Sequence, residues 1–479
     1  MTKSYLFYDI ETTGLSKAFD QVLQFAAIRT DRGLNEIDRH TVSVKLRPDV
    51  VPSPAAMLTN RISVPEFSKG LCEYEAVAQI HRLMNQPGTT SIGYNTMGFD
   101  DEFMRFSFHR NLLPPYTHQY KNGCSRMDLF PIAVIYQLYK KEVLVWPEID
   151  GKLSLKLEHL NTANRLVAGQ SHDAVVDVAA TIELARRFIK KKKIWRYLEG
   201  YFDKETDAHR LKDLPVAMQS GAGQHGLGLM VSGEYGPDQN YQIPVISIGR
   251  SIPYPNQTLW LRLDLPQLRD VTPESIAENT WVVRKRMGEP GILLPPHDRY
   301  WKKIGRERAG VFDENLKWLK ENHDMFQNIV EYYREYRYPF IPNLDPDASL
   351  YQIGFYSRAD ELLCRKFHRA SPENKIDLID QFSSPDARAL CLRVICRNYP
   401  AAVPAKLAAE FQNYMDRVQA ARQADAIVDY REKPRLTPIE ALNEIKHLKK
   451  SGDLIDHQST LLVELENYLR TTFKIRDTD

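Results

Sequence analysis

An apolar stretch near the start of the chain ends in two carboxylates, and this pattern constrains the fold most. Residues 5–8 are all aromatic or aliphatic, as in a buried strand, and Asp9 and Glu11 follow with one residue between them. Alternate residues of a strand point to the same face, so both acids should project together from its end. Adjacent carboxylates repel, and a cation such as Mg²⁺ or Mn²⁺ removes that repulsion. The alternative is a strand that simply ends in solvated acids.

The sequence around this strand predicts an α/β domain with a mixed sheet. Apolar runs predict strands over residues 4–11, 22–30, 40–47 and 89–95. Apolar spacing predicts helices over residues 73–85, 100–110, 128–140, 154–166 and 173–192. A turn signal at Asp31-Arg32-Gly33 makes the first three strands an expected antiparallel meander, and the whole order is typical of a layered α/β fold.

The composition changes near residue 195 and again after about residue 339. Residues 216–300 contain short apolar runs separated by Gly, Pro, Asn and Asp, which predicts a small barrel or sandwich followed by helices at 311–321 and 323–336. Residues 357–475 are helical throughout in pattern, which predicts an all-α region. We therefore expect three domains, over residues 1–194, 195–348 and 349–479.

Several classes of protein are excluded by composition. Hydrophobic residues make up 43% and charged residues 26% of the 479 residues, as in ordinary globular proteins. No apolar run approaches the roughly 20 residues that cross a bilayer, and no leader is expected. Five scattered cysteines favour a reducing cytoplasm over a disulfide framework or a zinc site. The net charge of +2 leaves nucleic-acid binding open, because clustering of charge matters more than the sum.

Two further acidic sites are candidates to join Asp9 and Glu11. Asp100 follows a predicted strand and opens a predicted helix, where an acid is also favoured simply by capping and by the helix dipole. Asp177 lies in the apolar part of a later helix, where burying a carboxylate is costly unless something pairs with it. His172 precedes Asp177 by just over one turn, so both are expected to face one pocket.

The three motifs together resemble a known superfamily of nucleases. D-x-E-T-T-G, N-x-x-x-F-D and H-D-A-x-x-D occur here in the order found in the DEDD exonucleases with histidine, which have a DnaQ-like, RNase H-like fold. Further matching stretches resemble the bacterial exonuclease I family: residues 24–31, 93–95, 99–102, 125–129, 157–160 and 172–174. That family continues with an SH3-like β domain and a helical domain, which is the order expected here.

The resemblance implies a chemistry for these residues. Asp9, Glu11, Asp100 and Asp177 correspond to four acids that hold two Mg²⁺ ions, with Mn²⁺ able to substitute, and His172 corresponds to the general base. The implied activity is 3′→5′ degradation of single-stranded DNA to 5′-mononucleotides. Such an enzyme serves DNA repair and recombination.

The resemblance also implies residues that bind the strand. Beside Glu11, the residues Thr12, Thr13 and Leu15 are expected to cradle the terminal nucleotide, with ordinary loop packing as the alternative. Stacking aromatics and a basic track suit sequence-independent binding of a single strand. The matching positions are Arg105, Tyr116, Tyr120 and Lys156, where the last two replace a Trp and an Arg of the best-known members. The lysine ammonium is a point charge, whereas the arginine guanidinium can bond a phosphate with two N–H groups, so the contact of Lys156 with the DNA backbone is expected to be looser.

Partners follow from the same family. Its three domains form a clamp round a single strand, which implies a monomer. The family also binds the acidic C-terminal tail of single-strand DNA-binding protein. The basic stretch at residues 299–308 is a candidate part of that site, and a solvated loop is the alternative. Two other functions stay open at this point: a 3′ RNA-trimming exonuclease of the same superfamily, and a non-catalytic adaptor that binds single strands.

Overall fold

A mixed five-stranded sheet forms the centre of the first domain. The computed structural model describes residues 3–169, 173–420, 425–451 and 454–475. Three strands form an antiparallel meander and two more run parallel to the first, in the order β3-β2-β1-β4-β5. Their bounds are β1 (Ser4–Thr12), β2 (Val22–Thr30), β3 (Glu36–Ser43), β4 (Thr89–Gly93) and β5 (Ser125–Asp128). The expected α/β fold with a mixed sheet is confirmed.

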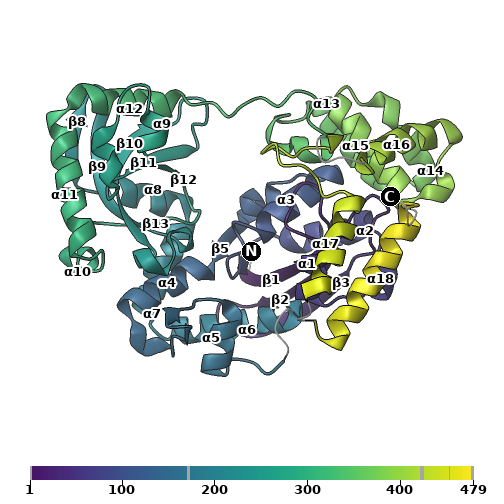
Figure 1. Cartoon of the computed structure of the whole chain (residues 1–479), viewed down its shortest axis with the longest axis horizontal. Helices are drawn as coiled ribbons and strands as arrows, with labels where there is room; N and C mark the ends of the chain where they lie inside the picture. The colour runs from purple at the N-terminus through teal and green to yellow at the C-terminus, as the bar shows by residue number, and fades with distance from the viewer. Residues whose placement is uncertain (1–2, 170–172, 421–424, 452–453, 476–479) are drawn as a thin grey trace.

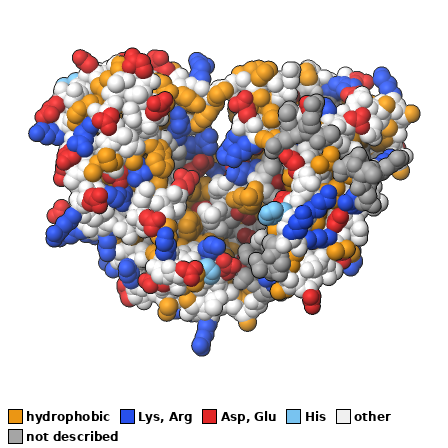
Figure 2. Space-filling view, viewed as in Figure 1, with side chains coloured by type: hydrophobic (Ala, Val, Ile, Leu, Met, Phe, Trp, Pro, Cys, Tyr) orange, Lys and Arg blue, Asp and Glu red, His pale blue; other side chains and the backbone are white. Residues whose placement is uncertain are grey.

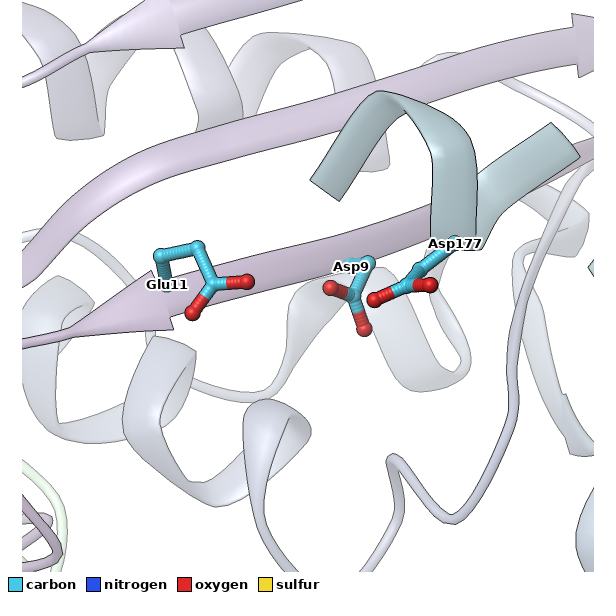
Figure 3. Close-up of side chains that lie close together, drawn as sticks. All are labelled: Asp9, Glu11 and Asp177. Carbon is cyan, nitrogen blue, oxygen red and sulfur yellow. The ribbon is translucent and has the colours of Figure 1, made fainter. Parts of the chain in front are cut away.

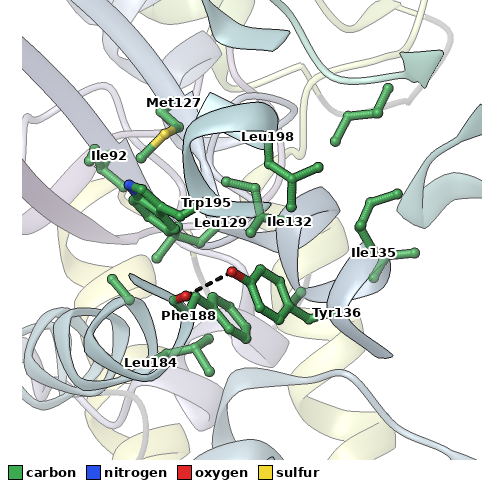
Figure 4. Packing of buried hydrophobic residues seen from close by; sticks show 14 of the residues in the cluster. Ile92, Met127, Leu129, Ile132, Ile135, Tyr136, Leu184, Phe188, Trp195 and Leu198 are labelled. Atoms are coloured by element: carbon green, nitrogen blue, oxygen red, sulfur yellow. Dashed lines mark hydrogen bonds between the residues drawn. The ribbon is translucent and has the colours of Figure 1, made fainter. Parts of the chain in front are cut away.

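Alternation along β1 assigns its two faces. Leu6, Tyr8 and Ile10 face a core that includes residues of α2 (Glu73–Met84) and α3 (Asp100–Arg110). Tyr5 and Phe7 face the opposite core, with residues of α4 (Leu129–Tyr139) and α6 (Ala174–Ile189). Figure 4 shows part of this second core, where the Tyr136 hydroxyl donates to the carbonyl of Phe188 at 2.7 Å. Asp9 and Glu11 continue the face of Tyr5 and Phe7, so both acids are directed toward α6.

An antiparallel sheet forms the second domain, called the sheet domain below. Its strand order is β12-β11-β10-β9-β13, with β8 paired to β9. The bounds are β8 (Val216–Ser220), β9 (Gly223–Val231), β10 (Gln242–Arg250), β11 (Gln257–Arg262), β12 (Val282–Arg286) and β13 (Ile292–Leu294). Its helices are α9 (Ile276–Asn279), α10 (Asp298–Trp301), α11 (Arg306–Glu321) and α12 (His323–Glu335).

Helices alone form the third part of the chain, called the helical region below. They are α13 (Arg358–Arg369), α14 (Pro372–Ile376), α15 (Pro385–Asn398), α16 (Ala405–Val418), α17 (Pro438–Ser451) and α18 (Asp456–Thr472). Both α17 and α18 contact α1 (Pro54–Asn60) of the first domain. In Figure 1 the sheet domain and the helical region stand on either side above the first domain, and the segment between α12 and α13 runs across the gap. None of the described helices is long and apolar enough to cross a membrane.

Several local predictions were wrong. The third strand covers residues 36–43 rather than 40–47, because the turn at residues 31–33 pairs Arg29 with Asp38 at once. No helix was predicted between the third strand and the helix expected over residues 73–85, where the structure has α1, whose Pro54 occupies the first helical turn, a place where proline is tolerated. Strands β5 and β8 were not predicted. Neither were the short pieces β6 (Glu148–Ile149), β7 (Lys152–Leu153), α7 (Lys192–Glu199) and α8 (Lys204–Lys212). The helix predicted over residues 154–166 is α5 (Leu157–Asn164).

Candidate active site

Three of the predicted acids meet where β1 passes under α6. Asp9 and Glu11 project from β1, and Asp177 lies in the first turn of α6, whose N-cap is Asp173. Each offers one carboxylate oxygen such that the three oxygens lie within 4.8 Å of one another. Figure 3 shows the carboxylates of Asp9 and Asp177 pointing toward each other, with Glu11 farther along the strand. The structure therefore brings these three together as the sequence predicted.

Burial and mutual repulsion both raise the pKa values of the acids in this group. Burial raises the pKa of Glu11 to about 9, and the neighbouring Asp9 and Asp177 add to the rise. Burial also raises the pKa of Asp9 well above its usual value, with repulsion from Asp100 and Asp177 as further causes. Among the described residues, no Lys or Arg forms an ion pair with Asp9 or Glu11. A half-buried set of carboxylate oxygens gathered this closely fits a hard divalent cation.

Asp100 adjoins this group without belonging to its tightest set. It is the first residue of α3 and is buried. Burial raises its pKa well above the usual value, and the charges of Asp128 and Glu11 contribute to the rise. The three acids within 4.8 Å do not include Asp100. Its carboxylate is nevertheless close enough to Asp9 to raise the pKa of that residue.

Asp128 is a supporting residue to which the sequence pattern assigned no role. It ends β5 and caps α4 by accepting from the backbone N–H of Phe130 at 2.9 Å. The same carboxylate accepts from the N–H groups of Asn95 and Met97, at 2.8 and 3.1 Å. These bonds fix the turn that leads from β4 into Asp100. An acid at the junction of a strand and a helix was the available signal.

The predicted nucleotide cradle follows β1 as a tight loop. The Thr13 hydroxyl is buried, donates to Asp20 at 2.9 Å and accepts from the N–H of Gln21. Thr12 donates to the carbonyl of Gly14 at 2.8 Å. Leu15 is 80% exposed at the tip. Thr13 therefore stabilises the loop, while Leu15 is the side chain that faces outward.

The other predicted contact residues lie in different settings. Lys156 is exposed and lines a cavity of about 560 Å³ that also includes Asn95 and Asp177 and, from the sheet domain, Gly236 and Tyr241. Arg105 is buried, and its Nε lies 3.3 Å from a carboxylate oxygen of Asp101. Tyr116 is half-buried and Tyr120 is 62% exposed, and neither lines that cavity. The predicted base His172 lies outside the described residues.

A cleft opens between the sheet domain and the helical region. Figure 2 shows the molecule hollowed between the sheet domain and the helical region, with Lys and Arg side chains on both walls.

In the candidate tail-binding stretch, residues 299–308, Arg308 is used in internal bonds, because it donates to Asp264 at 2.7 Å and to the carbonyl of Gln239 at 2.9 Å. Lys302 and Lys303 of that stretch are exposed.

Comparisons with known proteins agree on one family. The family model described as Exonuclease matches residues 6–185, and the one described as Exonuclease I C-terminal domain matches residues 344–472. Exodeoxyribonuclease I of Escherichia coli is 30% identical over 421 residues, which cover 83% of this chain and 86% of that protein. The chain belongs to the exodeoxyribonuclease I family. The Haemophilus influenzae member is 29% identical over 75% of this chain and 78% of its own length.

Solved structures of this family have the same architecture. E. coli exonuclease I in complex with a dA16 oligonucleotide superposes with a TM-score of 0.84 and 26% identity, covering 98% of this chain and all of that one. Exonuclease I of Methylocaldum szegediense gives a TM-score of 0.82 at 26% identity, with the same coverage. Two further solved structures are a zinc-bound complex of the E. coli enzyme with single-stranded DNA and a complex described as SSB/Exonuclease I with an inhibitor.

Membership of the family establishes the activity. The protein is a 3′→5′ exodeoxyribonuclease that acts on single-stranded DNA, and enzymes of this exonuclease family depend on divalent metal. The RNA-trimming and adaptor alternatives are not favoured.

Proposed function

We propose that this exodeoxyribonuclease hydrolyses the last phosphodiester bond of a single DNA strand with two Mg²⁺ ions held by Asp9, Glu11, Asp100 and Asp177. The observation that carries the proposal is the group of carboxylate oxygens from Asp9, Glu11 and Asp177, which lie within 4.8 Å of one another. When bound, the two cations activate the attacking water and stabilise the departing oxygen. Mn²⁺ has the same preference for oxygen ligands and is expected to substitute.

His172 is the proposed general base. It directly precedes Asp173, which caps the helix that carries Asp177. A neutral imidazole accepts a proton near neutral pH, so His172 takes the proton of the attacking water. The product is a 5′-mononucleotide, and loss of the imidazole should lower the rate about 10²–10⁴-fold.

The substrate strand approaches from the cleft. Leu15 at the loop tip contacts the terminal nucleotide, with Glu11, Thr12 and Thr13 shaping the loop beneath it. Lys156 neutralises a backbone phosphate in the cavity that it shares with Asp177. Tyr120 offers an exposed ring for stacking, and Tyr116 lies four residues before it, on the other side of the 3₁₀ segment Thr117–Gln119. The side chain of Arg105 is buried, so we propose that it attracts the DNA strand by its charge and positions neighbouring residues, without a direct contact of its own.

The finer organisation is also part of the proposal. The protein works as a monomer of three domains, over residues 1–194, 195–348 and 349–479. The acidic C-terminal tail of single-strand DNA-binding protein is its proposed protein partner, which the existence of a solved structure described as SSB/Exonuclease I supports. The exposed Lys302 and Lys303 are candidates to meet that tail.

The test is a digestion assay with 5′-labelled strands. Single-stranded DNA, duplex DNA and RNA are incubated with the protein, with and without Mg²⁺, beside Asp9→Ala and the control Asp313→Ala, which removes an exposed acid of α11. We expect Mg²⁺-dependent shortening of single-stranded DNA only, lost in Asp9→Ala and kept in the control. Digestion by Asp9→Ala at the parent rate, or without divalent cation, would contradict the metal assignment.

A further inference from the structure

Three consecutive buried acids begin α3, and only the first belongs to the site described above. Asp100, Asp101 and Glu102 are 7%, 0% and 8% exposed. Successive helix residues are rotated by about 100°, so their side chains leave the helix in three directions. Burying three carboxylates side by side is costly unless each finds compensating partners. We call these three residues the α3 junction.

Asp101 is directed toward the sheet domain. One of its oxygens pairs with His118 Nε2 at 2.9 Å, and the other accepts from Arg126 Nη1 at 2.6 Å. Arg126 also donates from Nη2 to Glu289 at 2.8 Å. Glu289 lies in the turn between β12 and β13, so two ion pairs connect the α3 junction directly to the second domain.

The turn that carries Glu289 is itself held firmly. Lys285 donates to the carbonyl of Glu289 at 3.0 Å and pairs with the fully buried Asp207 of α8 at 2.8 Å. Asp207 also accepts from the backbone N–H of Gly288 at 2.9 Å. The turn therefore holds Glu289 in one place in the sheet domain. Because Arg126 bonds to both Glu289 and Asp101, the position of Glu289 also restrains Asp101.

Glu102 is directed toward the helical region and the loop after β1. It pairs with Lys17 at 2.6 Å, and it accepts from the hydroxyls of Tyr351 and Tyr430 at 2.8 and 2.9 Å. Phe106, one turn along the helix, stacks on Tyr430 and meets Tyr351 edge-on. Tyr351 precedes α13 and Tyr430 precedes α17, so both belong to the chain beyond the sheet domain.

Lys17 extends this connection to the nucleotide loop. It lies two residues after Leu15, in the loop that Asp20 stabilises through the hydroxyl of Thr13 and the N–H of Ser16. Glu102 thus joins three parts of the molecule at one carboxylate: the loop, α3 and the helical region.

We propose that Asp101 and Glu102 are positioning residues through which the sheet domain and the helical region hold Asp100 and the nucleotide loop in their working geometry. The proposal deepens the proposed function, because it rests on Asp100 as a metal ligand. Partners beyond the direct ligands orient those ligands, and their loss commonly lowers metal affinity or activity 10–100-fold. Neither Asp101 nor Glu102 touches the substrate in this scheme.

Mild substitutions at the far ends of both connections test the proposal. Tyr430→Phe removes only the hydroxyl that reaches Glu102 and keeps the ring on Phe106, and Glu289→Gln removes the charge that meets Arg126. Glu102→Gln removes the charge of the carboxylate that joins Lys17 to the two tyrosines of the helical region. Tyr332→Phe, which deletes an exposed hydroxyl on α12, is the matched control.

Two readouts separate positioning from general stability. Mn²⁺ affinity is measured without DNA by calorimetry, and kcat and KM are measured on a 5′-labelled single strand over a range of Mg²⁺ concentrations. We expect Glu102→Gln to weaken Mn²⁺ binding about 10-fold and Tyr430→Phe and Glu289→Gln about 3-fold. We also expect kcat to fall with KM within two-fold of the parent, and to recover at high Mg²⁺. The control should match the parent.

The outcomes distinguish the two proposals. The positioning role of Asp101 and Glu102 is contradicted if the folded variants have the same Mn²⁺ affinity and kcat as the parent. It is also contradicted if the variants lose thermal stability while their Mn²⁺ affinity stays unchanged. If Glu102→Gln does not fold, Tyr430→Phe and Glu289→Gln decide. If Asp100→Asn itself binds Mn²⁺ and cuts DNA like the parent, the proposed function fails rather than the junction alone.

Discussion

At the scale of single residues, a carboxylate with no proposed step in the reaction sets the path of the chain into the site. Asp128 receives three backbone N–H groups, two of them from the turn before Asp100. Burial raises its pKa to about 6 against the opposing effect of those three bonds. Asp128 therefore stabilises the neighbouring turn through the placement of its two acceptor oxygens more than through its charge.

Replacing this carboxylate should affect stability and rate together. In Asp128→Asn one oxygen becomes an NH₂ group that cannot accept from an N–H, so a buried donor loses its partner at a cost of about 1–3 kcal/mol. We expect that loss in urea unfolding, with a lower single-turnover rate because the turn before Asp100 shifts. Asp313→Asn on the surface is the control, and equal stability of the two variants would contradict this view of Asp128.

Lys156 allows a test of a single phosphate contact. Each phosphate neutralised on a single strand contributes about 0.7 to the slope of log affinity against log salt concentration. Lys156→Ala should therefore lower that slope by about 0.7 in magnitude, measured by fluorescence anisotropy in Ca²⁺ without turnover. Lys317→Ala, on the far helix α11, should keep the parent slope. An unchanged slope in Lys156→Ala would remove this residue from the DNA path.

At the scale of elements, the loop after β1 is held closely around Asp20. Its chain leaves the sheet at a register shift between Glu11 and Thr12. A Cβ built on Gly14 would lie 2.4 Å from an oxygen of Asp20, the residue that holds Thr13 and Ser16. Only glycine leaves room there for that carboxylate.

A methyl group at this position should disturb catalysis more than folding. Gly14→Ala must displace Asp20 and shift the loop, and small misplacements near reacting groups cost about 10²-fold in rate. We expect a fall of that order in kcat/KM with secondary structure intact by circular dichroism. Gly310→Ala is the control, because an added Cβ would meet no atom within 4 Å outside the adjoining backbone of its own helix, and alanine is favoured in a helix by about 0.5–1 kcal/mol. Full activity in Gly14→Ala would show that the loop tolerates movement.

The sequence predicted those elements whose pattern is local. The alternation of β1, the start of α3 at Asp100 and the apolar face of α6 follow from periodicity and capping. The common face of Asp9 and Glu11 follows from the same alternation, while the resemblance to the nuclease superfamily implied that Asp177 joins them. Strand β5 was missed because its polar residues bond to partners far away in the sequence. Ser125 bonds to Thr90, and Arg126 bonds to Asp101. The sequence pattern placed Arg105 on the DNA strand, whereas in the structure its side chain is buried beside Asp101. Contacts between residues far apart in the chain carry no local signal.

At the scale of the whole molecule, a buried ionic network joins the first domain to the helical region. Asp49 accepts from Arg397 at 2.8 Å and from the Tyr414 hydroxyl at 2.9 Å, and Arg47 lies 3.3 Å from its other oxygen. Arg393 forks onto Asp345, the residue that caps the short segment before α13. Such a network holds the helical region in one orientation, because breaking one member leaves the others buried and unpaired.

The network predicts a sensitivity to acid. Burial alone would raise the pKa of Asp49, but the charges of Arg397, Arg47 and Arg435 outweigh it and hold that pKa well below its usual value. A depressed carboxyl pKa contributes stability that is complete above the unfolded value of about 3.9 and is lost as pH falls through and below it. The melting temperature should therefore fall steeply below about pH 4.

Removing the charge of Asp49 should reproduce that loss at neutral pH. Asp49→Asn leaves buried arginines without their partner, at a cost of about 3–5 kcal/mol, and should show a flatter dependence of melting temperature on acid. Differential scanning fluorimetry from pH 3 to 7 measures both effects, with Asp313→Asn as control. A parent-like melting temperature in Asp49→Asn would show that the network adds little.

The contact of α17 and α18 with α1 has a consequence for how the protein is made. Met57 and Phe106 share one apolar cluster with Ile445 and Leu469. On the ribosome these partners are separated by several hundred residues, which take roughly 20–80 s to add at about 5–20 residues per second. During that interval the nascent nuclease exposes part of its apolar surface to chaperones and proteases. A chain that stalls late in translation would then be recognised as unfinished.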